Sequence, residues 1–195
     1  MYRIKIMDDP KEPKLREMLL LEMVRQFRPE LAGQQLAVCR TEKGKPYVIM
    51  ASDGGTGRMI DGLHFSVSHS GDLWSCLMAD RPCGLDLQEL RPCNYEKLAA
   101  RFYTPVEQAY VTTAARDAGK TGSLHAFYKI WTRREALAKY TGLGFFGMGA
   151  DRPPLVSEDG KLLDSVEWNG RQVWFEEMEA PEEFLSVWCY EGDKL

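Results

Sequence analysis

Three short segments of this chain carry side chains that could hold a divalent cation beside phosphate groups: Phe65–Gly71 (Phe-Ser-Val-Ser-His-Ser-Gly), Gly84–Gln88 (Gly-Leu-Asp-Leu-Gln) and Trp131–Lys139 (Trp-Thr-Arg-Arg-Glu-Ala-Leu-Ala-Lys). Glu135 and Lys139 lie four residues apart in a segment of helical character, so a carboxylate and an ammonium share one helix face. Asp86 adds a second carboxylate within a short apolar run. Because Mg²⁺ is usually held by one or two carboxylates together with water and substrate phosphates, the segments predict a magnesium site for a phosphoanhydride substrate.

The order of these segments is similar to that in a known enzyme family. A Gly44-Lys45-Pro46 turn precedes the Ser68-His69 pair, the Gly84–Gln88 segment and the Trp131–Lys139 segment. With these four motifs the chain resembles, from about residue 40 to residue 144, the 4′-phosphopantetheinyl transferases of the larger single-chain, pseudo-dimeric class, the surfactin-synthetase-activating type. The resemblance implies transfer of phosphopantetheine from coenzyme A to a serine of an acyl or peptidyl carrier protein, with Mg²⁺ as cofactor. Adenosine 3′,5′-bisphosphate would be released.

The resemblance also implies a role for each matching side chain. Glu135 would remove the proton of the carrier serine or position a water that does so, and Lys139 would stabilise charge on the departing phosphate. The implied metal ligands are Asp86, Glu135 and Gln88. The expected coenzyme contacts are Arg16, Arg40, Lys43, Lys45, Pro46, Ser68, His69, Asp86 and Lys139. Among them, Arg16 and Arg40 are assigned only as basic groups that could reach phosphates.

Two positions depart from the family pattern. Gln88 stands where the family has a third acid, and an amide oxygen binds a cation less strongly than a carboxylate does. The neighbouring Glu89 does not replace it, because alternation along a strand turns Glu89 to the other face. We therefore expect a two-carboxylate site. Arg134 stands where the family has a lysine, and its guanidinium is expected to clasp a phosphate.

Other interpretations of the same residues remain open. Taken alone, Glu135 and Lys139 would more often be a surface ion pair, and Asp86 could be a strand-end cap. A serine hydrolase is disfavoured because Ser68 and His69 are adjacent on a strand and point to opposite faces. A non-catalytic module that binds coenzyme A or a carrier protein is the main alternative, and Gln88 supports it. A Mg²⁺-dependent nucleotide hydrolase is a third interpretation, and it would release adenosine bisphosphate without a carrier.

Composition limits the class of protein and its partners. With 195 residues, 44% of them hydrophobic, the chain can form one domain or two small ones. A net charge of −4 and a pI near 5.5 argue against general binding to nucleic acid, which needs a basic surface. The five cysteines include no Cys-x-x-Cys pair and are expected to be reduced thiols. No signal-peptide core or membrane span is found in the sequence, so a cytoplasmic protein without membrane contact is expected. The resemblance implies a monomer, because the pseudo-dimeric class is usually complete as one chain.

Hydrophobic periodicity predicts a mixed α+β fold. Strands are expected at 2–7, 36–39, 47–50, 64–67, 74–78, 85–87 and 184–190, a hairpin with an Asn169-Gly170 turn at 166–175, and a Gly-rich loop at 51–62. Helices are expected at 12–27, 94–102, 105–118 and 123–140, with Thr104 as an N-cap, a break at 119–122 and Gly142 as a C-cap. Together with the resemblance, this pattern predicts two similar α/β subdomains related by a pseudo-twofold axis. Residues 1–83 would bind the coenzyme, residues 84–195 would carry the metal and catalytic groups, and the active site would lie at their interface.

Overall fold

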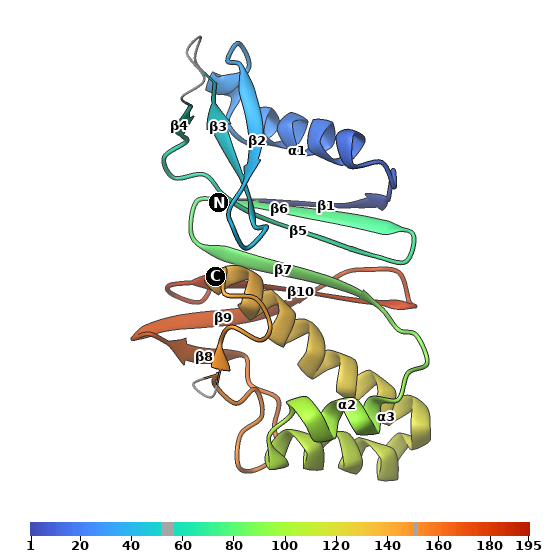
Figure 1. Cartoon of the computed structure of the whole chain (residues 1–195). Helices are drawn as coiled ribbons and strands as arrows, with labels where there is room; N and C mark the ends of the chain where they lie inside the picture. Colours follow the sequence, from blue (N-terminus) through green and yellow to red (C-terminus); the bar gives the residue numbers. More distant parts are fainter. Residues whose placement is uncertain (52–56, 150–151) are drawn as a thin grey trace.

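The chain has a mixed α and β architecture, as the hydrophobic pattern predicts. The computed structural model describes residues 1–51, 57–149 and 152–195 (Figure 1). The first half contains β1 (Tyr2–Asp8), α1 (Pro13–Phe27), a 3₁₀ turn (Pro29–Leu31), β2 (Leu36–Arg40), β3 (Pro46–Met50), β4 (Arg58–Met59), β5 (His64–Ser70) and β6 (Leu73–Ala79). The second half contains β7 (Cys83–Glu89), α2 (Tyr95–Phe102), α3 (Pro105–Thr141), β8 (Ser165–Trp168), β9 (Arg171–Met178) and β10 (Phe184–Glu191).

The strands form three antiparallel sheets. Their orders are β1-β6-β5, β2-β3-β4 and β7-β10-β9-β8. Buried side chains of α1, among them Val24 and Phe27, pack with Val48, Phe65 and Trp74 in the core of the first half. A second core surrounds Phe127, and a third, which includes Leu77, Leu85 and Trp188, joins strands of both halves. The two halves are therefore in contact through apolar packing as well as through polar bonds.

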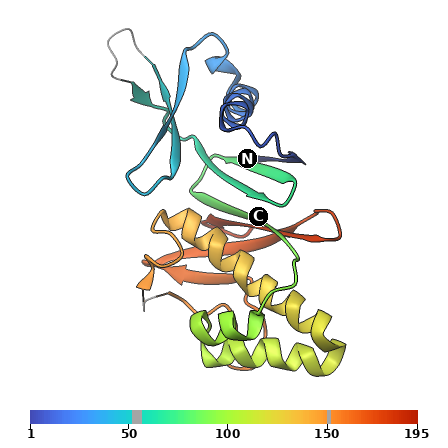
Figure 2. The same ribbon diagram turned by 45° about the vertical axis from the view of Figure 1, so that its right-hand side comes forward.

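The two larger sheets meet where β5 and β7 lie side by side (Figures 1 and 2). Alternate residues of β5 are serines, and alternation along a strand turns them to one face. Ser66 Oγ accepts a hydrogen bond from the Leu85 amide at 2.9 Å, and Ser70 Oγ accepts one from the Glu89 amide at 3.0 Å. Serine hydroxyls of β5 thus satisfy backbone donors of β7 and hold the two strands together. We call this contact the serine seam, formed by Ser66, Ser68 and Ser70 against β7.

Helix α3 packs closely on β7 because Gly84 has no side chain. A Cβ atom added at Gly84 would lie 2.0 Å from the Ala136 carbonyl oxygen and 2.7 Å from the Tyr140 amide nitrogen. Both neighbours are backbone atoms, which cannot move aside as the end of a flexible side chain can. The helix turn after Glu135 is therefore placed directly against the strand that carries Asp86.

Helix α3 is assigned without interruption from Pro105 to Thr141, so the predicted break at 119–122 is wrong. Gly119 nevertheless has φ 65°, in the left-handed region that favours glycine, and the segments on either side of it run in different directions (Figure 2). Glu107 and Arg134 lie 27 residues apart in α3 and yet form an ion pair, so the chain must fold back between them. In a straight helix, 27 residues would span about 40 Å.

The other predicted elements are mostly confirmed, with small corrections. Thr104 forms a capping box with Glu107, and Gly142 ends α3 at φ 70°. Asn169 and Gly170 both have positive φ, as a type I′ turn requires. The predicted Gly-rich loop contains the short strand β4, and its residues 52–56 lie outside the described residues. None of the described helices is both long enough and apolar enough to cross a membrane.

A substitution of Gly84 tests the close packing of α3 on β7. We expect Gly84→Ala to lower the free energy of unfolding by about 2 kcal/mol or more, because the added methyl group forces the helix away from the strand. Urea unfolding followed by tryptophan fluorescence measures this change. Gly33→Ala is the matched control, since an added Cβ there meets no heavy atom within 4 Å. Equal stability of the Gly84→Ala variant and the wild type would contradict the packing described.

Candidate functional site

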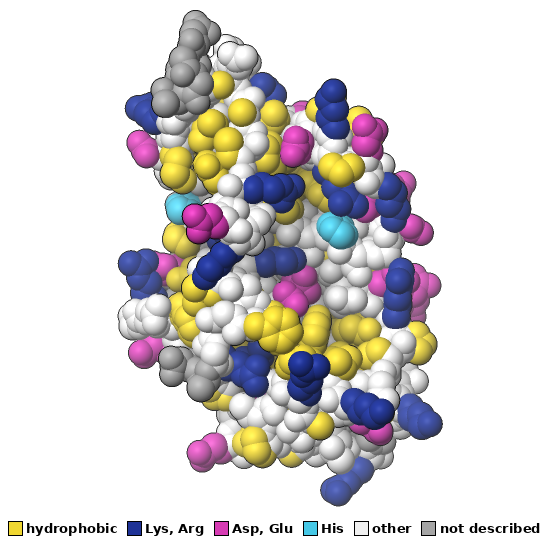
Figure 3. Space-filling view, in the orientation of Figure 1, with side chains coloured by type: hydrophobic (Ala, Val, Ile, Leu, Met, Phe, Trp, Pro, Cys, Tyr) yellow, Lys and Arg dark blue, Asp and Glu magenta, His cyan; other side chains and the backbone are white. Residues whose placement is uncertain are grey.

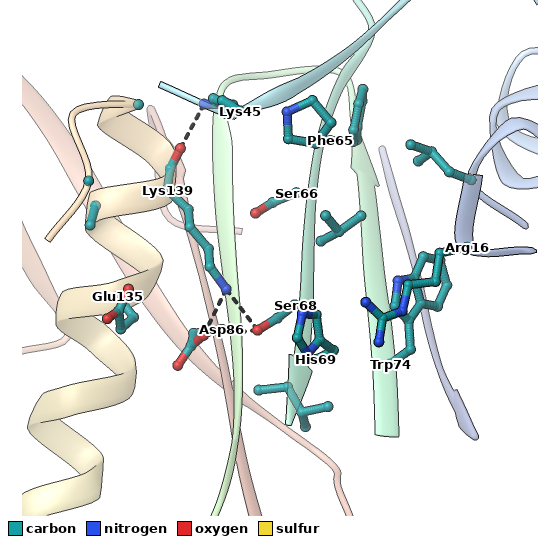
Figure 4. Close-up of a pocket in the computed structure, with 18 of the residues that line it drawn as sticks. Arg16, Lys45, Phe65, Ser66, Ser68, His69, Trp74, Asp86, Glu135 and Lys139 are labelled. Carbon is teal, nitrogen blue, oxygen red and sulfur yellow. Dashed lines mark hydrogen bonds and ion pairs between the residues drawn. The ribbon is translucent and has the colours of Figure 1, made fainter. Parts of the chain in front are cut away.

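A pocket of about 500 Å³ opens between the two halves, beside the serine seam. It is lined by β5 and β7, by the last turns of α3, by the turn between β2 and β3, and by α1 (Figure 4). On the face shown in Figure 3, acidic and basic side chains gather between the upper and lower parts of the molecule. All eleven side chains predicted to form the site line this pocket: Arg16, Arg40, Lys43, Lys45, Pro46, Ser68, His69, Asp86, Gln88, Glu135 and Lys139.

Three elements meet at a cluster of Ser68, Asp86 and Lys139 (Figure 4). The Lys139 ammonium lies 2.8 Å from Asp86 Oδ1 and 2.7 Å from Ser68 Oγ, and the Ser68 hydroxyl donates to Asp86 Oδ1 at 2.9 Å. The cluster therefore connects β5, β7 and α3. The sequence spacing suggested a pairing of Lys139 with Glu135, whereas the ion pair of Lys139 in the structure is with Asp86.

Asp86 and Glu135, the two pocket carboxylates predicted to bind the cation, both have raised pKa values. Burial raises the pKa of Asp86, although Lys139 and Ser68 act in the opposite direction. Burial, together with the negative charge of Asp86, raises the pKa of Glu135 to about 7, and Lys139 only partly offsets this. Within the described part of the chain, Asp86 Oδ2 is buried without a hydrogen-bond partner.

These two carboxylates fit a divalent cation. A buried carboxylate oxygen without a partner and a second carboxylate with a raised pKa would both be stabilised by added positive charge. Oxygen donors of this kind are those that Mg²⁺ prefers. The described residues contain no group of three or more His, Cys, Asp or Glu side chains arranged to hold a metal ion. Asp86 and Glu135 are the acidic residues of β7 and α3 that line the pocket, and Glu17 lines it from α1.

Gln88 lies on the same strand as Asp86 and also lines the pocket. Its amide nitrogen donates to the Glu89 carbonyl oxygen at 3.0 Å and to Ser70 Oγ at 3.4 Å. These bonds fix the amide nitrogen against the seam and do not use the amide oxygen. The oxygen is therefore the atom of Gln88 that is available to a cation or to water.

The opposite wall of the pocket carries basic groups from the first half. Arg16 forms a bidentate pair with the buried Asp9, with Nε 2.7 Å from Oδ1 and Nη2 2.5 Å from Oδ2, and this pair keeps the pKa of Asp9 below its usual range. His69 is exposed on β5, while the adjacent Ser68 is buried, which confirms that the two side chains point to different faces. Partial burial, with a contribution from Arg16, lowers the pKa of His69. Arg40 donates to the Gly44 carbonyl oxygen at 3.2 Å.

Arg134 lies outside the pocket, so the expectation that it clasps a phosphate is wrong. Its side chain is completely buried and forms an ion pair with Glu107, and it also donates to the Pro153 carbonyl oxygen at 3.1 Å. Glu107 further accepts a hydrogen bond from the Leu155 amide at 2.9 Å. Arg134 therefore connects the two ends of α3 with the segment that follows it, which is a structural role.

Two residues of the serine seam, Ser66 and Ser70, were not predicted. Ser66 lines the pocket, and both residues hold β7 in place. Their signal was available in the sequence, because serine recurs at every second position from 66 to 70. A strand that turns three hydroxyls to one buried face requires polar partners there.

Comparison with known proteins agrees with the motifs. Residues 82–153, which include Asp86, Glu135 and Lys139, match the model of the 4′-phosphopantetheinyl transferase superfamily. The resemblance to these transferases is confirmed. The chain is 29% identical over 160 residues to 4′-phosphopantetheinyl transferase psf-1 of Bacillus pumilus. The matched residues make up 82% of this chain and 62% of that protein.

Two further relatives belong to the same group of enzymes. A 4′-phosphopantetheinyl transferase of Bacillus subtilis is 29% identical over 148 residues, covering 76% of this chain and 60% of that protein. The AcpT transferase of Salmonella typhi is 35% identical over 103 residues, covering 52% of this chain and 47% of that protein. The chain thus spans about 60% of the length of the two Bacillus relatives.

The raised pKa of Glu135 predicts a pH-dependent cost in stability. The pKa is about 7 in the folded chain against an ordinary value of 4.5, so between these values the folded chain binds more protons than the unfolded chain. The free energy of unfolding therefore falls as the pH rises through this window. Without divalent cations, we expect Glu135→Gln to be more stable than the wild type by about 1–3 kcal/mol at pH 8, and the difference to narrow toward pH 5.

Chemical unfolding at the two pH values, in the presence of EDTA, measures this effect. Glu167→Gln is the matched control, because Glu167 is exposed on β8 and lies outside the pocket. A difference between Glu135→Gln and the wild type that is the same at both pH values would contradict the proposed titration.

Proposed function

We propose that this chain transfers the 4′-phosphopantetheine group of coenzyme A to a serine of an acyl or peptidyl carrier protein, with Mg²⁺ as cofactor. The observation that carries the proposal is the cluster of Asp86, Glu135 and Lys139 in one pocket, within the segment that matches the superfamily model. The curated relatives support the same reaction class. Because the chain spans only part of their length, the activity and the partners of this chain are proposals.

The reaction needs a nucleophile from the carrier and a group that accepts its proton. The carrier serine oxygen attacks the β-phosphorus of coenzyme A, the bond from that phosphorus to the bridging oxygen breaks, and adenosine 3′,5′-bisphosphate leaves with the electron pair. Glu135 is suited to receive the serine proton, or to position a water that does so, because its carboxylate lines the same pocket as Asp86 and Lys139. Lys139 is suited to stabilise the charge that develops on the phosphate oxygens.

Asp86, Glu135 and the Gln88 amide oxygen are the proposed ligands of the cation, which when bound would neutralise charge on the pyrophosphate. Ser68 and Lys139 donate to Asp86 Oδ1 and leave Oδ2 without a bond from the described residues. We therefore propose Oδ2 as the oxygen that Asp86 offers to the cation. Ser68 would then act by orienting this carboxylate, in addition to the coenzyme contact that the resemblance implies.

The basic wall of the pocket is the proposed site for the nucleotide part of coenzyme A. Arg40 and Lys43 offer donors and positive charge to its phosphates, and His69 offers a ring N–H donor. Arg16, which is paired with Asp9, adds a further guanidinium to this wall. The side chain of Lys45, for which the resemblance implies the same role, donates to the end of α3, whereas Pro46 lines the same region and is proposed to contact the coenzyme. A ligand of this kind would extend across the pocket, from the basic wall to the two carboxylates.

We further propose that residues 1–83 and 84–195 are subdomains related by a pseudo-twofold axis, with the active site between them. The separate apolar cores of the two halves and the position of the pocket beside the serine seam support this division. A monomer that acts in the cytoplasm is the proposed state of the protein.

A binding module without catalysis is the second candidate, and Gln88 is the observation that favours it. With an amide in place of the third acid of the family pattern, the site holds a cation with two carboxylates. Such a protein would bind coenzyme A or a carrier without transferring the phosphopantetheine group. A nucleotide hydrolase would instead release adenosine bisphosphate in the absence of any carrier.

Mass spectrometry of an apo carrier protein tests the proposed reaction. Incubated with this chain, coenzyme A and Mg²⁺, the carrier is expected to gain the mass of one phosphopantetheine group, and EDTA should abolish the gain. We expect Glu135→Gln and Asp86→Asn each to slow the transfer by about 10²-fold or more, because they remove the proton acceptor and a cation ligand. Glu167→Gln should react at the wild-type rate.

Two results would contradict the proposal. If several acyl and peptidyl carriers gain no mass although coenzyme A binds, the binding module is favoured. If adenosine bisphosphate is released without a carrier, the hydrolase is favoured.

A further inference from the structure

Lys45 lies in a turn whose backbone is well fixed. The Thr41 amide donates to the Lys45 carbonyl oxygen at 2.9 Å, and the Lys45 amide donates to Thr41 Oγ1 at 3.1 Å. These bonds close the turn that joins β2 to β3, and Pro46 begins β3. The side chain of Lys45 therefore leaves a rigid hairpin and reaches toward the second half of the molecule.

The Lys45 ammonium binds the end of α3, as Figure 4 shows. It donates to the Lys139 carbonyl oxygen at 2.6 Å and lies 3.3 Å from the Tyr140 carbonyl oxygen. The last carbonyl groups of a helix lack partners within the helix and carry its negative dipole end, so a cation is favourable there. The side chain also passes close to Gly142, whose added Cβ would lie 3.5 Å from Lys45 Cδ.

No ion pair of the described residues includes Lys45, so the helix end is what compensates its charge. Burial lowers the pKa of Lys45, as expected for an ammonium removed from water without a carboxylate partner. Lys43, in the same turn, is exposed and lines the pocket. The two lysines of this turn therefore have different surroundings, although the sequence makes them look equivalent.

We propose that Lys45 is a positioning residue that fastens the β2–β3 turn to the C-terminal end of α3. Lys139 is held at two points: its carbonyl oxygen by Lys45, and its ammonium by Asp86 and Ser68. Lys45 thereby fixes the direction of the Lys139 side chain and joins the two walls of the pocket. This inference rests on the proposed function for its effect on turnover, but the clamp itself is a property of the chain without substrates.

Hydrogen exchange followed by mass spectrometry tests the clamp without any substrate. In Lys45→Met we expect the amides of residues 41–45 to exchange at least about threefold faster than in the wild type, because the turn is released from the helix. Lys45→Arg keeps a charged donor and should restore part of the protection. The matched control is Lys14→Met, at an exposed lysine of α1, which should leave the exchange of residues 41–45 unchanged.

Kinetics separate positioning from direct contact with a phosphate. We expect Lys45→Met to lower kcat about tenfold or more while the Kd for coenzyme A changes less than about threefold, since a positioning residue acts through Lys139. Lys43→Met, which removes a charge facing the pocket, should mainly raise that Kd. A large rise in Kd for Lys45→Met, with kcat and hydrogen exchange as in the wild type, would overturn the inference. If the wild-type chain transfers nothing, the proposed function fails, and the exchange comparison still decides whether the clamp exists.

Discussion

The contact between Lys139, Asp86 and Ser68 is the interaction on which the pocket depends, because it is where β5, β7 and α3 meet. One carboxylate oxygen of Asp86 receives both donors, which leaves the other oxygen buried and without a bond from the described residues. Asp86 is costly to bury as an anion, and Lys139 compensates only part of that cost. The arrangement is therefore complete only when further positive charge arrives, which is the physical reason to expect a cation at this place.

The surrounding structure brings the three groups together by unusually close packing of backbone. Serine hydroxyls of β5 receive amides of β7 along the seam, so the two sheets approach each other through side-chain bonds. Gly84 lets the backbone of α3 come into contact with β7. The serine seam, the close approach of α3 at Gly84 and the end of α3 together place Asp86 between Ser68 and Lys139. The close packing of the backbone and the buried charged site are thus parts of one arrangement.

Local patterns in the sequence predicted most of the helices and strands, because these depend on short spacings. The four-residue spacing of Glu135 and Lys139 and the position of Asp86 in a strand led to side chains that line one pocket. The Thr104 cap and the Asn169-Gly170 turn are equally local signals. What could not be predicted depends on contacts between distant residues. Arg134 faces Glu107 only because α3 changes direction at Gly119, and Lys45 meets α3 only in the folded chain. The alternation of serines in the sequence indicates a polar face at Ser66 and Ser70, but no local pattern indicates that this face binds β7.

A crystal structure with coenzyme A and Mg²⁺ bound would test the central claim most directly, because the claim concerns where one ligand lies. The account predicts the pyrophosphate beside Lys139, the cation at Asp86 Oδ2 and Glu135, and the nucleotide along the basic wall near His69. Coenzyme A bound elsewhere on the molecule, or bound with its pyrophosphate away from Asp86 and Glu135, would contradict it.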